Sequence, residues 1–202
     1  MPKTKEQLEI LRNQRKQDII QAATLIFAFV SYHEITVDRI TKAARCSHGL
    51  FYHYFDSIDD LYDQVMQNAI NMLDDEVFAK KYENRSAREV LETATQFYCD
   101  LLNSDDDVRI ACMYLLLNNR LRIQLVPELK KYETKSIYAT DKLTRVIIAG
   151  QKEGVFYEGN ASDMSRCLVS LINGLTFSRL YLGKNSFISP DKSIILKLII
   201  KE

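Results

Sequence analysis

Residues 47–54 form a short run rich in groups that can bind nucleic acid. The hydroxyls of Tyr52 and Tyr54, and that of Thr36 a little earlier in the chain, can donate hydrogen bonds to phosphate oxygens. The N–H groups at the start of a helix can do the same. Gly49 carries no side chain, so the backbone there can approach a phosphate or a groove wall closely. These residue types predict contact with a phosphate backbone.

The same run also carries side chains that can reach base edges. An imidazole can hydrogen-bond to a purine acceptor, and an apolar side chain can meet a thymine methyl, which suits His48, Leu50 and His53 to base contact. Successive helical residues turn by about 100°, so Phe51 and Phe55 share one face while the neighbouring residues point elsewhere. We expect the two phenylalanines to be core and the polar rings to be free to meet DNA.

Two short helices must position these side chains. Thr36 can cap a helix over residues 37–44, and Ser47 can cap another over about 48–54. The three residues 45–47 join them, and two short helices joined by such a turn form a helix-turn-helix. The pattern therefore predicts a DNA-binding motif with its second helix carrying the contacts.

The remainder of the chain also indicates helices. Only 6 of the 202 residues are Gly and 3 are Pro, too few for the many turns of a sheet protein, and no strand alternation is visible. A long first helix is predicted at about 6–31 from its apolar spacing. Caps and apolar spacing predict further helices at about 58–82, from 86, around 113–117, from 127 to 154, at 162–183 and from 189. The fold class predicted is all-α.

Charge is uneven along a chain that is neutral overall, with 27 basic and 27 acidic side chains. Residues 1–55 sum to +3, residues 56–107 to −10, and the remainder to +7. This distribution is typical of two parts with different partners, although solvated helix faces would give it equally well. We expect two domains, over residues 1–57 and 58–202, and the helix-turn-helix places DNA binding in the first.

Other classes of protein fit the sequence poorly. The chain carries no HExxH, P-loop, GxSxG or dinucleotide glycine motif, so we expect no enzyme and no cofactor. His48 and His53 lie about 140° apart around a helix and do not converge with Cys46, so no metal is expected. Four scattered cysteines and an apolar stretch of only nine residues, Ala22–Val30, predict a cytoplasmic protein without a membrane span.

The segment described above resembles the N-terminal domain of the TetR family of transcriptional repressors, and the resemblance covers roughly residues 15–66. The matching positions are Thr36, Val37, Ile40, Ala44, Ser47, Gly49, Tyr52, Tyr54, Phe55, Ser57 and Leu61. Four positions depart from the family pattern. Arg45 replaces a turn glycine, Ile58 replaces a lysine that meets phosphate, and Ser31 and Thr41 replace Gly and Ala. A positive φ at Arg45 would cost on the order of 1 kcal/mol.

The resemblance implies a ligand-responsive regulator, most often a repressor. It implies a cytoplasmic homodimer whose two DNA-binding domains enter successive major grooves of a palindromic double-stranded operator. The residues expected to contact DNA are Thr36, Arg45, Ser47, His48, Gly49, Leu50, Tyr52, His53 and Tyr54. The alternative function is a helical small-molecule-binding protein that does not act on DNA.

The resemblance also implies that the last two helices hold the dimer together. An apolar stripe over 162–182, in which Gly174 permits close backbone approach, and an apolar tail over 194–200 agree with this. The same residues would also suit core packing within one chain. The predicted interface residues are Leu168, Leu171, Gly174, Leu175, Leu196 and Ile199.

The resemblance also implies a small-molecule pocket in the larger domain. The sequence alone does not separate the residues that line this pocket from those of the core. Aromatic and methionine side chains at helical spacing are as consistent with plain core as with a pocket. The candidate lining residues are Tyr98, Leu101, Met113, Leu117, Tyr138 and Phe177. The effector itself is unknown from the sequence.

Overall fold

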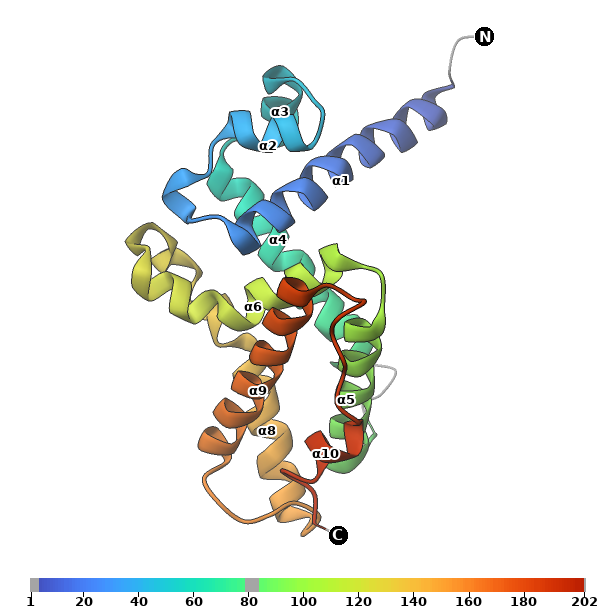
Figure 1. Cartoon of the computed structure of the whole chain (residues 1–202), viewed down its shortest axis with the longest axis vertical. Helices are drawn as coiled ribbons and strands as arrows, with labels where there is room; N and C mark the ends of the chain where they lie inside the picture. Colours follow the sequence, from blue (N-terminus) through green and yellow to red (C-terminus); the bar gives the residue numbers. More distant parts are fainter. Residues whose placement is uncertain (1–3, 79–83, 202) are drawn as a thin grey trace. The chain divides into compact units, whose positions relative to one another are not determined.

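The computed structural model describes residues 4–78 and 84–201 (Figure 1). All regular elements within these ranges are helices, and the one β contact among them is an isolated bridge between Phe156 and Ile200. The predicted all-α class is therefore confirmed. The chain divides into two compact units, residues 1–68 and 69–202, with the division falling inside one helix. Whether the DNA-binding domain ends at residue 57 stays a prediction.

The first unit contains α1 (Lys5–Phe29), the 3-10 turn η1 (Tyr32–Glu34), α2 (Val37–Ala43), α3 (His48–Tyr54) and the start of α4 (Ile58–Leu73). Its helices begin at the capping residues that the sequence predicts. The Arg39 N–H donates to Thr36 Oγ1 at 3.2 Å, and the Leu50 N–H donates to Ser47 Oγ at 3.2 Å. The side chains that close the core are Ile19, Ala23, Phe27, Ile40, Phe51, Phe55, Leu61, Tyr62 and Val65.

The helix predicted at 58–82 is shorter as an α-helix than the sequence indicates. α4 ends at Leu73 and passes into one π-helical turn, η2 (Asp74–Phe78). Residues 79–82, the end of the prediction, lie outside the described residues. A π-helical turn is rare and needs support from its surroundings, so local capping rules cannot reveal it.

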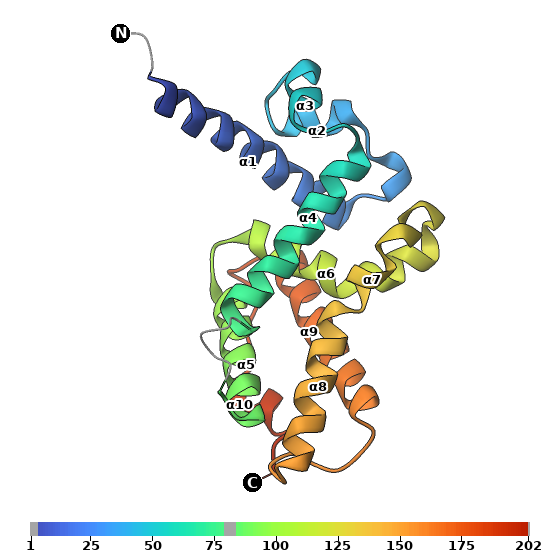
Figure 2. The same ribbon diagram turned by 180° about the vertical axis from the view of Figure 1, so that it is seen from behind.

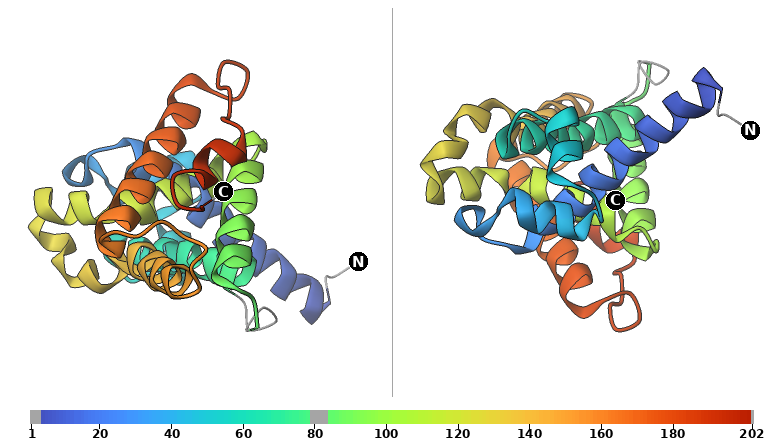
Figure 3. Two further views of the ribbon diagram at one scale, coloured as in Figure 1. Left: turned by 90° about the horizontal axis from the view of Figure 1, so that it is seen from below. Right: turned by 90° about the horizontal axis from the view of Figure 1, so that it is seen from above.

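The second unit contains α5 (Ala87–Asn103), α6 (Asp107–Leu125), η4 (Pro127–Tyr132), α7 (Glu133–Ser136), α8 (Tyr138–Lys152), α9 (Ala161–Leu182) and α10 (Lys192–Leu196). α8 and α9 run side by side, and α6 also packs on α9 (Figure 2). α10 lies against α5, as the view from below shows (Figure 3). The core between these helices includes Leu91, Cys99, Ile147, Phe156, Leu168, Ile195, Ile199 and Ile200.

Two predicted helices of this unit are wrong in extent. The helix expected from 127 to 154 consists of three pieces, so Tyr138 begins α8 instead of lying within a helix that starts at Pro127. The last helix is five residues long, because the chain after it turns back and pairs with residues 155–157. The Tyr157 N–H donates to the Ile199 carbonyl at 2.9 Å, a long-range contact that sequence periodicity cannot show.

Within residues 4–78 and 84–201, no helix combines the length and the apolar character needed to cross a lipid bilayer.

Candidate nucleic-acid interface

One aromatic face of α3 anchors this helix in the first unit. Phe51 and Phe55 are 0% and 1% exposed, and their ring centroids lie 5.6 Å apart. Burying each phenylalanine stabilises the fold by about 1.5–3 kcal/mol. The predicted core role of this pair is therefore confirmed, and the opposite face of the helix is left to solvent.

The exposed face of α3 presents the polar rings. Tyr52 is 57% exposed, and His48, Gly49 and His53 are also exposed, whereas Tyr54 is half-buried. The Tyr52 ring stands edge-on to Phe51 at 5.3 Å, so a core residue limits its orientation. The helix thus holds a phenol, two imidazoles and a side-chain-free backbone position on one solvent-facing surface. Leu50 is half-buried beside them.

The capping hydroxyls remain able to donate to a partner. Thr36 Oγ1 and Ser47 Oγ each accept a backbone N–H from their own helix. A hydroxyl that accepts one hydrogen bond still carries its own proton, which can be donated to a phosphate oxygen. Both residues are exposed, so their predicted phosphate contacts are sterically open.

The turn between α2 and α3 has one strained residue. Arg45 has φ of +51° and is exposed, the single positive φ outside glycine within the described chain. The following Cys46 N–H donates to the Thr41 carbonyl at 2.9 Å and closes α2. The conformation expected from the usual turn glycine is therefore adopted by an arginine, which costs about 1–2 kcal/mol and places a cation beside α3.

Sequence reasoning missed an ion-pair cluster at this surface. Lys42 Nζ lies 2.8 Å from Asp38 Oδ2, and His48 Nε2 lies 3.6 Å from Asp38 Oδ1. The hydrogen bond from Lys42, its positive charge and then His48 lower the pKa of Asp38. A carboxylate facing phosphate would repel it, so the charge of Lys42 offsets that of Asp38. The i,i+4 spacing of Asp38 and Lys42 was the available signal.

In the second unit a small apolar cavity of about 80 Å³ lies between the helices. Three of the predicted pocket residues line it, Tyr98, Met113 and Leu117. The Tyr98 hydroxyl bonds to α9, at 2.5 Å from the Ile172 carbonyl and 2.6 Å from Thr176 Oγ1. Burial raises the pKa of Tyr98, so it stays a neutral donor that joins α5 to α9.

The other three predicted pocket residues lie elsewhere. Leu101 is buried against a second, outer groove, and Phe177 is 48% exposed and stacks on Tyr181 with centroids 5.9 Å apart. Tyr138 is not in the cavity lining, and its hydroxyl donates to Asp74. A pocket role for Leu101 or Phe177 therefore has no support from the inner cavity.

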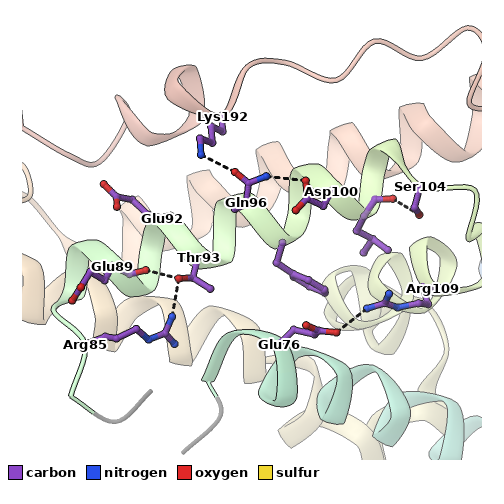
Figure 4. Close-up of a pocket in the computed structure, with 12 residues that line it drawn as sticks. Glu76, Arg85, Glu89, Glu92, Thr93, Gln96, Asp100, Ser104, Arg109 and Lys192 are labelled. Carbon is purple, nitrogen blue, oxygen red and sulfur yellow. Dashed lines mark hydrogen bonds and ion pairs between the residues drawn. The ribbon is translucent and has the colours of Figure 1, made fainter. Parts of the chain in front are cut away.

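The outer groove, of about 710 Å³, follows the outside of α5 (Figure 4). Its labelled side chains mostly bond to one another. Arg109 pairs with Glu76 at 3.4 Å, and Lys192 Nζ lies 2.7 Å from Gln96 Oε1. Both acidic and basic side chains line the groove, so its electrostatic potential does not favour a ligand of one charge.

The predicted interface residues separate into two groups. Leu168 and Ile199 are each 3% exposed within one subunit, so they pack inside it and offer no surface to a second copy. Leu171 is 37% exposed and Gly174 is exposed, whereas Leu175 and Leu196 are half-buried. The apolar surface of α9 continues through Phe177, Tyr181 and Leu182. Spacing alone identified buried positions without distinguishing core from interface.

Comparison with known families agrees with this geometry. The sequence profile described as "Bacterial regulatory proteins, tetR family" matches residues 19–65, from the second half of α1 into α4. This segment of the chain therefore resembles the DNA-binding domain of the TetR family. The matched segment contains α2, the turn and α3 with their exposed polar face.

A characterised relative has the same domain type. The HTH-type transcriptional regulator HbdR of Aromatoleum sp. (strain CIB) is 26% identical over 140 residues, which are 69% of this chain. The match spans 60% of the length of that relative.

Solved structures of two regulators share the fold over nearly the whole chain. The fatty acid degradation regulator FadR from Bacillus halodurans superposes with a TM-score of 0.66 at 18% identity, covering 91% of this chain and 92% of its own. AibR, solved with isovaleryl coenzyme A and operator DNA, superposes with a TM-score of 0.64 at 13% identity, covering 91% and 94%. At these identities the likeness establishes the fold.

Proposed function

We propose that this chain is a sequence-specific DNA-binding transcriptional regulator of the TetR family that acts as a homodimer in the cytoplasm. The observation that carries the proposal is α3 itself. Buried phenylalanines fix one side of this short helix, and its other side presents Tyr52, His48 and His53 to solvent. A rigid helix with polar rings on one exposed face suits insertion into a major groove.

The contacts divide by chemistry. Thr36, Ser47, Tyr52 and Tyr54 carry hydroxyls suited to phosphate oxygens, and Arg45 adds a positive charge in the same region. These contacts set affinity and register. His48, Leu50 and His53 are proposed to read base edges, and Gly49 allows the backbone to approach the groove wall.

A dimer would supply two copies of α3 to one operator. The exposed apolar surface of α9 at Leu171, Gly174 and Phe177 supports an interface along this helix. Two-fold symmetry requires a palindromic operator, with half-sites separated by about 34–36 Å.

Control by a small ligand completes the proposal. The inner apolar cavity of the second unit supports an effector, and AibR, with the same fold, was solved with a thioester ligand and operator DNA. A ligand that binds better to the conformation unable to fit both half-sites lowers DNA affinity by population shift. In this proposal the chain represses transcription, and the ligand relieves that repression.

Selection from random double-stranded DNA tests the proposal without a known operator. Purified full-length protein is mixed with a random 30-base-pair pool, and bound DNA is recovered and sequenced over several rounds. Enrichment of a palindromic motif is expected, with contacts in both half-sites. Recovery of no motif at low salt, by protein whose circular dichroism shows it folded, would remove the regulator function.

A further inference from the structure

A positive charge lies beside one aromatic wall of the inner cavity. Phe78 of η2 and Leu143 of α8 line the cavity, whose walls are almost wholly apolar. Lys142, next to Leu143, places its ammonium 5.0 Å from the centroid of the Phe78 ring and 5.3 Å from that of Tyr138. A cation therefore lies against an aromatic wall of an apolar space.

Asp74 is the group that holds this cation. Its Oδ1 lies 3.5 Å from Lys142 Nζ and also accepts a hydrogen bond from the Tyr138 hydroxyl. The Asp74 and Lys142 side chains are 38% and 36% exposed. An ion pair with that much exposure contributes little net stability, so another carboxylate can replace Asp74 at small cost.

A second wall of the cavity repeats the arrangement. Phe97 of α5 lines the cavity, Arg109 lies 5.8 Å from its ring centroid, and Glu76 pairs with Arg109 at 3.4 Å. Both carboxylates, Asp74 and Glu76, belong to η2. This π-helical turn thus supplies an internal anion to each cation at the two aromatic walls, and it continues directly from α4.

We propose that the cavity binds a small aliphatic monocarboxylate whose carboxylate reaches Lys142 and Tyr138, which lie beside the Phe78 wall outside the cavity lining. The apolar chain occupies the cavity, and the carboxylate displaces Asp74 from the Lys142 ammonium and the Tyr138 hydroxyl. Lys142 is chosen over Arg109 because it has this hydroxyl beside it as a second donor. The inference rests on the proposed ligand control and names the chemical class of the effector.

The size of the cavity limits the chain length. Its volume of about 80 Å³ is roughly half that of the apolar cavity of about 150 Å³ that holds benzene. Half of the six carbons of benzene is about three, so acids with about two to four apolar carbons beside the carboxylate are expected to fit, and a long fatty acid is not.

Isothermal titration calorimetry with the full-length chain tests the ligand class. The probes are propionate, butyrate, pentanoate, hexanoate and decanoate, with pentanamide as the uncharged match. Pentanoate is expected to bind at least tenfold more tightly than pentanamide and more tightly than decanoate. Equal binding of pentanoate and pentanamide would overturn the carboxylate role, and tightest binding of decanoate would overturn the size limit.

Two substitutions that remove the same ion pair give a matched comparison. Lys142→Gln is expected to weaken pentanoate binding at least tenfold, whereas Asp74→Asn is expected to tighten it about threefold or more by removing the internal competitor. If the ion pair had a purely structural role, both substitutions would change the pentanoate affinity in the same direction, and that result would overturn the inference. Tyr138→Phe is expected to weaken binding severalfold. Arg109→Gln is the control, and a tenfold loss there in place of Lys142→Gln would contradict the assignment to Lys142.

The same protein samples separate this inference from the proposed function. Binding to the motif selected from random DNA is measured by fluorescence anisotropy with and without each probe. Specific DNA binding without calorimetric binding of any carboxylate up to about 10 mM would overturn the carboxylate site and leave the regulator intact. Loss of specific DNA binding in folded protein would overturn the regulator function instead.

Discussion

Replacing Arg45 with glycine should stabilise the protein and at the same time weaken its hold on DNA. Arg45 has φ of +51°, a conformation that costs a non-glycine residue about 1–2 kcal/mol, whereas glycine adopts it freely. Glycine also loses more backbone entropy on folding, by about 0.5–1 kcal/mol, which offsets part of this gain. The net increase in the free energy of unfolding is expected to be about 0.5–1 kcal/mol.

This gain corresponds to a rise in melting temperature of about 1–4 °C for a chain of this length. Differential scanning calorimetry measures it, with Arg45→Lys as the control because lysine keeps both the strain and the charge. The lysine variant is expected to melt close to the parent protein. A lower melting temperature for Arg45→Gly would refute the strain argument.

The effect on DNA binding follows from counterion release. Each phosphate contact contributes about 0.9 to the slope of log affinity against log salt, so one contact per subunit contributes about 1.8 in a dimer. Anisotropy titrations at several salt concentrations should show a slope shallower by that amount for Arg45→Gly, with Arg45→Lys near the parent. An unchanged slope for the glycine variant would remove Arg45 from the phosphate contacts.

Three further substitution sets test the fold, the interface and the contacts. Gly150→Ala should lower the free energy of unfolding by about 1–3 kcal/mol, because the added Cβ would lie 2.1 Å from Phe156 Cδ2. Urea titrations measure this change, and an unchanged midpoint would contradict the packing of Phe156 on Gly150. Gly174→Lys should give monomers in sedimentation, because the added Cβ meets no atom of its own subunit within 4 Å and the side chain would project into the proposed interface; a dimeric lysine variant would place the interface elsewhere. Tyr52→Phe should weaken binding to operator and scrambled DNA alike. In competition assays, His53→Ala should reduce the preference for particular base pairs by about 1–3 kcal/mol. An unchanged preference would show that His53 does not contact bases.

The helix-turn-helix was predictable because its signals are local. The hydroxyls of Thr36 and Ser47 accept N–H groups three residues ahead, so the sequence alone marks where α2 and α3 begin. The predicted bounds of α3, about 48–54, match the structure. The burial of Phe51 and Phe55 followed equally from spacing within a single helix.

The second unit depends on contacts between distant residues, which spacing does not reveal. Leu168 and Leu171 both belong to the predicted apolar stripe on α9, yet Leu168 is core and Leu171 is 37% exposed. Which face a helix buries depends on its neighbours, and α9 has α6 and α8 against it. The Asp74–Lys142 pair spans a long separation in sequence and was invisible for the same reason.

In the proposed function, α3 gives the chain its sequence preference for DNA. Fluorescence anisotropy with DNA from immediately upstream of its own reading frame, beside a scrambled fragment at two salt concentrations, measures this preference. We expect a preference of about 10³-fold or more for the upstream fragment, with affinity falling steeply as salt rises. Failure to bind either fragment at low salt would contradict it.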